Sequence, residues 1–428
     1  MQEYEKPLYL LMAASIAVCV VIGVVSDGLV QSLQGLLLLQ QHAGRLINDF
    51  TLIGGVGGAM FNAASMGILF LLLVRMSDIR LSGPTIAAVF TIMGFSLFGK
   101  TPSNALPIVI GVYLAGRIAG KPFTSYIIIA MFGTALGPLV SFLTYEAGFT
   151  GAGALLLGAL GGVLAGILLP ALSMAMLKFH EGYNIYNIGF ASGFLGLFAA
   201  AMLAASNFDV SIRVIWNDEP YLGLTLLVPI VSLLFIIFGI AVDGKKIFGN
   251  LKELLSQTGR LPSDFIEMVS PGSALVNSGA LGLAASAYLL IIGADINGPT
   301  IGGMLTIMGF ATFGKHLKNS WPVAAGVFTA TLLFGKSLTA PGPVLALLFG
   351  TTLAPIAGEF GILIGFAAGF THLLIVERTA AWHGGMDLYN NGFAGGLTAT
   401  LFVAVIEWVE ANKKYVPHKG KRLKEVDQ

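Results

Sequence analysis

Two lysines at matching places are the residues of this sequence best suited to recognise charge. Lys100 ends the segment TIMGFSLFGK (residues 91–100), and Lys315 ends the nearly identical TIMGFATFGK (residues 306–315). Both follow apolar runs, and a lysine at bilayer depth is costly enough to be a functional candidate. Two such ammonium groups could form an anion site, replace a coupling cation or carry a proton. The alternative is that both side chains snorkel to an interface.

A second repeated set combines histidine, amide and phenol side chains. The segment HEGYNIYNIGFASG (residues 180–193) matches HGGMDLYNNGFAGG (residues 383–396), each just before an apolar element. A helix start of this kind can bind an anion through free N–H groups, and histidine adds a proton switch. The same residues could instead be N-caps alone, and their spacing is not that of metal ligands, so neither metal nor cofactor is expected. The candidate substrate-binding residues here are His180, Asn184, Tyr186, Asn187, His383, Tyr389 and Asn390.

Four further amides recur in both halves of the chain. Asn62 and Asn277 lie in the second apolar element of each half, while Asn104 and Asn319 follow the two lysines. A lone asparagine in a membrane helix more often joins helices than binds a ligand. All four remain candidate substrate contacts beside the lysines.

The repetition breaks at two acidic positions. Glu181 stands where the second half has Gly384, and Asp387 stands where the first half has Asn184. Coupling of transport to an ion gradient requires such a difference between the halves. Glu181 and Asp387 are therefore the predicted coupling residues for protons or sodium, the alternative being that each is solvated at the start of a helix.

The composition places these residues in a membrane protein. Of 428 residues, 56% are hydrophobic and 11% charged, whereas soluble domains carry about 25% charged residues. A net charge of +1 argues against a nucleic-acid partner. The expected partners are the lipid bilayer and a small-molecule or ion substrate. The sequence has no Gly-x-x-x-x-Gly-Lys-Ser/Thr loop, which argues against ATP-driven transport by this chain.

Each half is predicted to contain about seven apolar elements. The first half has them at 8–27, 53–76, 84–100, 106–120, 124–145, 151–177 and 187–206. The second half has them at 220–242, 272–292, 299–315, 322–336, 341–357, 360–376 and 389–411. A full crossing needs about 20 residues, so the short third and fourth elements, bounded by Pro84, Pro107, Pro299 and Pro322, are typical of broken helices around a binding site. Seven crossings per half, or five plus a re-entrant hairpin, are both compatible with this pattern.

Charged segments between the elements predict the orientation in the membrane. Residues 30–50 and 245–266 are predicted as interfacial helices that end in the motif Gly-Arg-Leu-x-x-Asp-Phe and could support a homo-oligomer. The lysines and arginines at 245–260 and in the tail favour the cytoplasm, and the acidic connector favours the outside. The predicted order is a first transmembrane repeat (1–206), an extracytoplasmic connector (207–219), a second, inverted transmembrane repeat (220–411) and a basic cytoplasmic tail (412–428).

The motifs Gly-Phe-x-x-Phe-Gly-Lys and His-x-Gly-x-x-x-Tyr-Asn-x-Gly-Phe resemble those of an uncharacterised prokaryotic family of duplicated polytopic membrane proteins, a domain of unknown function. The resemblance covers nearly the whole chain and implies no substrate. The architecture is similar to inverted-repeat transporters of the nucleobase–ascorbate type and to urea-transporter-like channels, without the signature residues of either.

The sequence thus predicts an all-α polytopic protein of the cytoplasmic membrane, with two inverted-topology repeats, 10–14 spans and both termini in the cytoplasm. The predicted function is secondary transport of a small polar or anionic solute by alternating access, coupled to ions or protons. One alternative is a passive channel for a urea-like solute. A membrane-embedded enzyme with His180 or His383 as general base is disfavoured, because chemistry normally occurs once and these residues occur twice.

Overall fold

The structure, a computed structural model, describes residues 4–413, and helices account for nearly all of its regular secondary structure. The first half of the chain holds α1 (Glu5–Leu39), α2 (Phe50–Ile53), α3 (Gly55–Met76), α4 (Gly83–Phe95), α5 (Pro102–Ile118), α6 (Ile127–Gly133), α7 (Gly137–Tyr145), α8 (Gly151–His180) and α9 (Asn187–Ala205). The second half holds α10 (Leu222–Asp243), α11 (Ile247–Leu254), α12 (Phe265–Met268), α13 (Pro271–Ile292), α14 (Gly298–Phe310), α15 (Leu317–Leu333), α16 (Pro341–Gly350), α17 (Ala354–Phe360), α18 (Ile362–Trp382) and α19 (Asn390–Lys413). The predicted all-helical fold is confirmed for these residues. Residues 414–428, with most of the predicted basic tail, lie outside them.

The helices of the two halves follow one another in the same order. Helices α3 and α13 both have 22 residues, α4 and α14 both have 13, and α5 and α15 both have 17. The predicted interfacial segment of the first half continues α1 beyond a kink at Gly28, where φ is 76°. In the second half the corresponding segment is the separate helix α11. Neither segment is helical as far as its Asp-Phe motif.

Ten helical stretches within residues 4–413 are long and apolar enough to cross a membrane. Two of them are helices broken in the middle, α6–α7 and α16–α17, each with a single 3-10 turn at the break (Thr134–Leu136 and Thr351–Leu353). Helices α4 and α14 are shorter than a bilayer is thick. The chain is therefore a multi-pass membrane protein at the lower end of the predicted 10–14 spans.

The fourth element of each half begins earlier than predicted. Pro107 and Pro322 were expected at its start but lie inside α5 and α15. These helices begin five residues or so before the prolines because a polar turn supplies a complete capping box. The cap and its partner are Thr101 with Asn104 in α5, and His316 with Asn319 in α15.

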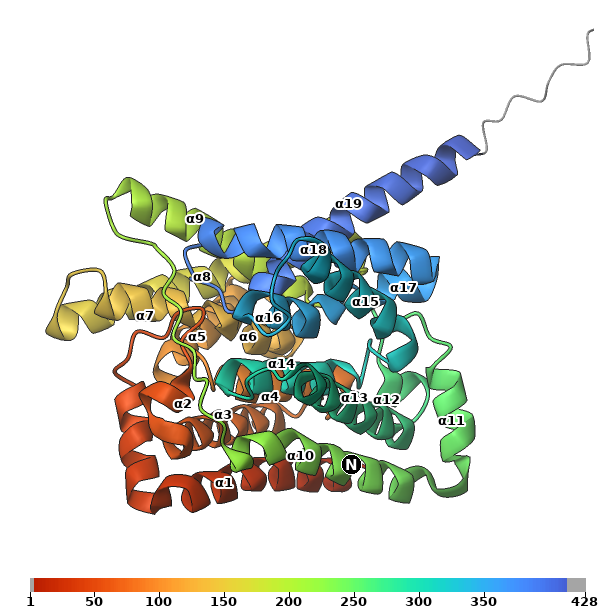
Figure 1. The fold of residues 1–428 in the computed structure, drawn as a ribbon. Coiled ribbons are helices and arrows are strands. Elements are labelled where there is room, and N and C mark those ends of the chain that lie inside the picture. The colour runs from red at the N-terminus through yellow and green to blue at the C-terminus, as the bar shows by residue number, and fades with distance from the viewer. Residues whose placement is uncertain (1–3, 414–428) are drawn as a thin grey trace, which may run out of the picture.

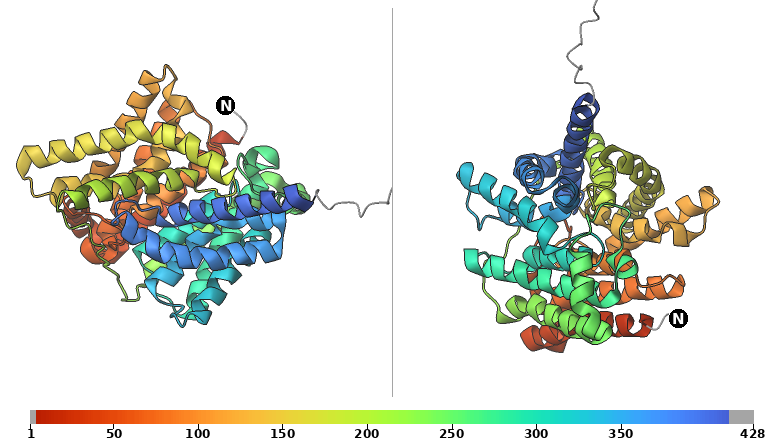
Figure 2. Two further views of the ribbon diagram at one scale, coloured as in Figure 1. Left: turned by 90° about the horizontal axis from the view of Figure 1, so that it is seen from above. Right: turned by 90° about the vertical axis from the view of Figure 1, so that its right-hand side faces the viewer.

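The helices form layers around α4 and α14 (Figure 1). Helices α1, α3, α10 and α13 pack together on one side, with α1 beside α10. On the opposite side α8, α9, α19 and α18 lie next to one another in that order, which the turned views also show (Figure 2). Helices α4 and α14 cross the middle and are buried along almost their whole length, which explains why they are apolar on every face.

The two central helices run antiparallel in direct backbone contact. The hydroxyl of Thr312, just after α14, donates to the carbonyl of Gly83 at the start of α4 over 2.9 Å. In the middle, a Cβ added to Gly94 would lie 2.8 Å from the carbonyl oxygen of Gly302, and one added to Gly302 would lie 2.8 Å from that of Gly94. Only glycine allows two helices to approach this closely at such a point.

We predict that Gly94→Leu destabilises the protein, because its side chain has only the backbone of α14 to displace. Overpacking of this kind costs about 1–3 kcal/mol or more. The measurement is the midpoint of thermal unfolding in detergent. Gly153→Leu in α8 is the matched control, because nothing lies within 4 Å of a Cβ at that position. Equal midpoints for the two variants would contradict the close contact of α4 with α14.

Candidate functional site

Lys100 and Lys315 are completely buried, each in the turn that follows a central helix. The Nζ of Lys100 donates to the hydroxyl of Thr134 over 2.7 Å, and the Nζ of Lys315 donates to that of Thr351 over 2.8 Å. Both threonines lie at the break of a broken helix, α6–α7 or α16–α17. A glycine before each break and a proline shortly after it interrupt the helix there. Each ammonium group therefore points to a helix break and away from the protein surface.

Two tyrosines lie between the lysines. The rings of Tyr186 and Tyr389 are 5.1 Å apart, and they pack edge-on against Phe310 at 4.4 Å and Phe95 at 4.7 Å, respectively. The Nζ of Lys315 donates to the hydroxyl of Tyr186 over 2.5 Å and lies 4.5 Å from the centre of its ring. Since Tyr186 belongs to the first half and Lys315 to the second, the site is built from both halves.

A pocket of about 190 Å³ reaches this aromatic centre from one side. Its lining comes from the start of α4, from α6, from the end of α14 and from the loops at 185–189 and 261–263, and it includes both Tyr186 and Tyr389. The walls are mostly apolar, with phenol and hydroxyl groups at a few points. An apolar lining with a few well-placed polar groups is typical of small-molecule binding sites.

Asn62 and Asn277 hold the lysine turns in place. The side-chain amide of each donates to two carbonyl groups of the turn that follows α4 or α14, one at the C-cap and one at the lysine. The acceptors are Ser96 and Lys100 in the first half, both at 2.7 Å, and Ala311 and Lys315 in the second, at 2.8 and 2.7 Å. The geometry makes both asparagines positioning residues.

Asn104 and Asn319 close the same turns from the other end. Their side-chain oxygens accept from the backbone N–H groups of Thr101 and His316, at 2.9 and 2.8 Å. Their amide groups donate to the carbonyl groups of Gly99 and Gly314, at 2.9 and 3.0 Å. These hydrogen bonds go to the loop itself and leave little capacity for a solute.

The two histidines pair with asparagines of their own segments. His180 Nε2 lies 3.0 Å from Asn187 Oδ1, and His383 Nε2 lies 3.0 Å from Asn390 Oδ1. The amides of these asparagines donate to the carbonyl groups of Ser173 and Val376, at 3.1 and 3.2 Å. Each pair therefore ties the end of one long helix to the start of the next, α8 to α9 and α18 to α19.

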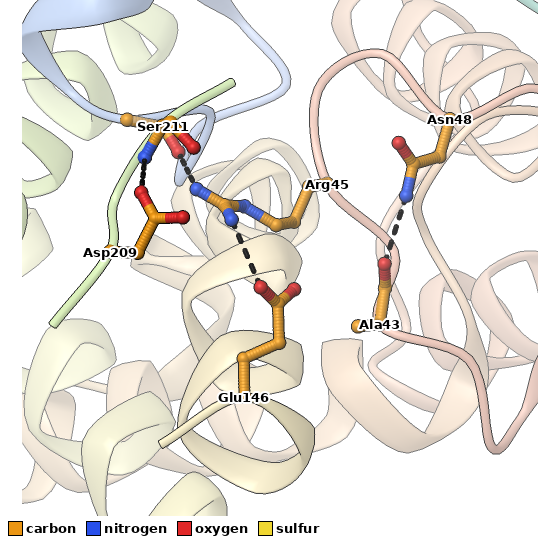
Figure 3. A network of polar contacts seen from close by, with 7 residues as sticks. Ala43, Arg45, Asn48, Glu146, Asp209 and Ser211 are labelled. Carbon is orange, nitrogen blue, oxygen red and sulfur yellow. Dashed lines mark hydrogen bonds and ion pairs between the residues drawn. The ribbon is translucent and has the colours of Figure 1, made fainter. Parts of the chain in front are cut away.

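The Gly-Arg-Leu-x-x-Asp-Phe motif joins the two halves, which the sequence did not reveal. Arg45 is buried, with Nη1 3.0 Å from a carboxylate oxygen of Glu146 (Figure 3). Its Nη2 lies 2.6 Å from the carbonyl oxygen of Gly384. Arg260 makes the matching contact, with Nε 2.8 Å from the carbonyl of Glu181. Each arginine thus holds the histidine loop of the opposite half. The only sequence feature that pointed to a role for these arginines was the presence of the motif in both halves.

The aspartates of the same motif cap the central helices of the opposite half. Asp264 accepts from the N–H of Gly83 at the start of α4 over 3.2 Å. Asp49 lies at the start of α14, so close that a Cβ on Gly298 would be 2.5 Å from its Oδ1. A carboxylate at a helix N-terminus satisfies free N–H groups and the helix dipole. Both aspartates are therefore positioning residues.

The two predicted coupling residues lie in different surroundings. Glu181 forms an ion pair with Arg260 over 3.0 Å, and both side chains are more than a third exposed. Asp387 is completely buried beside Tyr389, whose backbone N–H donates to Asp387 Oδ1 over 3.1 Å. Of the two, the structure brings only Asp387 to the lysine and tyrosine centre.

Comparison of the chain with curated proteins and with solved structures finds no match. Residues 11–205 and 243–408 match the family described as "Protein of unknown function (DUF1576)". These two segments carry both copies of the lysine motif and both copies of the histidine motif, and together they make up most of the chain. The chain therefore belongs to the DUF1576 family.

Proposed function

We propose that this protein is a secondary transporter that carries a small anionic solute by alternating access between two inverted halves. The observation that carries the proposal is the pair of buried lysines. Within residues 4–413, neither Lys100 nor Lys315 takes part in a salt bridge. A buried ammonium group without a direct ion pair costs several kcal/mol, and hydroxyl partners do not neutralise it. A bound anion supplies the missing charge.

Inverted halves are supported by the central helices. Equivalent helices related by a two-fold axis in the membrane plane must run in opposite directions, as α4 and α14 do. The short helices α2 and α12 likewise lie at opposite sides of the molecule (Figure 1). Five crossings with a re-entrant pair in each half, α4–α5 and α14–α15, agree with the ten long helices. This is also the arrangement that the charges between the elements predict.

Access from one side at a time is supported by the pocket beside Tyr186. It is lined by the loop at 261–263, which follows the basic segment predicted to be cytoplasmic. At the equivalent position on the other face the packing is tighter: a Cβ added to Gly99 would lie 2.8 Å from the side chain of Leu388, whereas one added to Gly314 beside the pocket would lie 3.3 Å from that of Ile185. We infer that the structure represents a state open toward the cytoplasm. The broken helices α6–α7 and α16–α17 are the elements whose bending would reverse this opening.

We predict that purified protein in proteoliposomes accumulates at least one small anion against its gradient when a proton or sodium gradient is imposed. The probes are lactate, succinate and sulfate, each supplied separately. Lys100→Gln and Lys315→Gln should each reduce the initial uptake rate at least about tenfold, which corresponds to about 1.4 kcal/mol of lost interaction. Lys336→Gln is the matched control, because Lys336 forms a partly exposed ion pair with Glu377 over 2.9 Å.

Two results would contradict the proposal. If the probes equilibrate rapidly whatever the gradient, and flux survives the lysine substitutions, the protein is a channel. If none of the probes enters, and urea enters instead, an anion site at the lysines is wrong.

We predict that substitution of Asn277 lowers the stability of the protein, whereas substitution of Lys315 lowers solute uptake. Asn277→Ala leaves two buried carbonyl groups without their donor and should cost about 1–3 kcal/mol of stability, seen as a lower unfolding midpoint in detergent. Lys315→Gln should lose uptake but keep the midpoint within a few degrees. Asn412→Ala is the control, because Asn412 is exposed and bonds only within α19. An Asn277→Ala variant that is as stable as wild type but fails in uptake would make this amide a substrate contact.

A further inference from the structure

The two halves differ sharply at one buried place, beside Asp387 and its counterpart Asn184. At the site around Lys315 and Thr352, both polar side-chain atoms of Asn184 have hydrogen-bond partners. Its Oδ1 accepts from the hydroxyl of Thr352 over 2.5 Å and from the N–H of Tyr186 over 3.1 Å. Its Nδ2 donates to the carbonyl of Gly392 over 3.1 Å. The Tyr186 hydroxyl, in turn, is bonded to Lys315. At this site the polar side chains therefore have hydrogen-bond partners within the protein.

The matching place around Asp387 lacks these partners. Asp387 Oδ2 has no hydrogen-bond partner among the described residues, because the residue matching Thr352 is Ala135. The Tyr389 hydroxyl, which matches the one bound to Lys315, also has none. Lys100 Nζ bonds Thr134, and the carbonyl of the next residue, Ala135, accepts from the N–H of Leu388 over 3.0 Å. Asp387 and Lys100 therefore lie on either side of the same helix break, yet no salt bridge joins them.

Two further hydroxyl groups without partners surround the same place. Thr91 Oγ1 lies near the Tyr389 hydroxyl but forms no hydrogen bond to it, whereas the matching Thr306 bonds the carbonyl of Gly302 over 2.7 Å. Ser192 stands where the second half has Gly395, and a Cβ on Gly395 would lie 3.3 Å from Asn184 Oδ1. Buried polar atoms nearly always have partners, so a cluster of unpaired ones indicates a place for an exchangeable species.

We propose that Asp387 is the proton carrier of this transporter and that Lys100 is both its counter-charge and an anion contact, so that one proton travels with each solute. This inference rests on the proposed function and names its coupling site. In the empty state the Asp387 carboxylate faces the Lys100 ammonium. A solute anion that binds at Lys100 pairs with the ammonium group in place of Asp387. The negative charge of Asp387 is then uncompensated in an apolar interior, which is costly.

A proton removes this cost. It comes from water on the side to which the site is open and forms an O–H bond at Asp387 Oδ2, which is the unpaired oxygen. After the site opens to the other side, the solute leaves and Lys100 regains Asp387 as its partner. The proton then dissociates from Oδ2 to water on that side. Each cycle moves one proton and one solute molecule and returns both residues to their starting charges.

The other titratable groups facing this place do not replace Asp387. Tyr389 is in the same loop, and His383 lies against it, its Nε2 already paired with Asn390. From the opposite half, Arg45 reaches the carbonyl of Gly384 but is already paired with Glu146. Sodium is disfavoured as the coupling ion, because the Lys100 ammonium already occupies the cationic position.

The test introduces, at positions 387 and 135, the hydrogen-bonded pair that Asn184 and Thr352 form at the related site. Asp387→Asn combined with Ala135→Thr recreates the Asn184–Thr352 pair and so protects the fold. Proteoliposomes containing the proton-sensitive dye pyranine are supplied with lactate, succinate or sulfate, with and without a pH gradient. Wild type should move protons inward together with the accumulated anion. The double variant should exchange labelled for unlabelled anion at a rate within about fivefold of wild type but lose all accumulation driven by the pH gradient.

Two matched variants separate coupling from folding. Asp387→Glu keeps a carboxyl group and should keep accumulation driven by the pH gradient, at a lower rate. Glu181→Gln changes the other candidate carboxylate, which is partly exposed and paired with Arg260, and should leave proton movement unchanged. His383→Gln should also retain the coupling, because His383 Nε2 is already paired with Asn390 and carries no proton of the cycle.

The outcomes distinguish this inference from the proposed function. If the double variant still accumulates anion on a pH gradient, or loses exchange as well while remaining folded, Asp387 is not the proton carrier. If wild type transports anion without proton movement, the inference about Asp387 fails, and the proposed function as an anion transporter is retained. If wild type moves no anion at all, the proposed function itself fails.

Discussion

The structure depends on satisfying the ends of two helices that cannot reach water. Helices α4 and α14 begin and end inside the protein, and free backbone groups at such ends are costly in an apolar interior. Asp264 and Asp49 supply acceptors at the two starts, while Asn62 and Asn277 supply donors at the two ends. Because each aspartate comes from the opposite half, the central pair forms only when both halves are present.

This requirement explains why so many of the conspicuous polar residues are structural. Once the amides and histidines are assigned to helix ends and loops, few buried polar groups remain that the fold itself does not need. Among those that remain in the described residues are the lysines, the tyrosine pair and Asp387, which lie around the breaks in α6–α7 and α16–α17. Function in a membrane interior is concentrated where polar groups are kept in spite of their cost.

The duplication in the sequence was enough to predict the order of the helices, and composition was enough to predict a multi-pass membrane protein. Sequence spacing could not predict the contacts of Arg45, because it bonds Gly384, a residue more than three hundred positions away. The role of Asn62 could not be predicted either, since an asparagine inside an apolar segment gives the same sequence pattern whether its amide bonds a helix end or a solute. Ala135 carried no signal, because an alanine is unremarkable until the Thr352–Asn184 bond shows what is missing.

For the proposed alternating-access transporter the differences between the halves matter, because perfect symmetry would make states open to either side equal in energy and in chemistry. In the proposed transporter, two related lysine sites would bind an anion but would give no reason for it to move with a proton. Replacing Asn184 by an aspartate at the related position, and Thr352 by an alanine, turns a closed hydrogen-bond network into an open, titratable one. The change adds a charge at one position and removes its neutral partner at another. Both are needed, because an added carboxylate that still accepted a threonine hydroxyl would keep a fixed partner, and a removed threonine beside an amide would offer nothing to protonate.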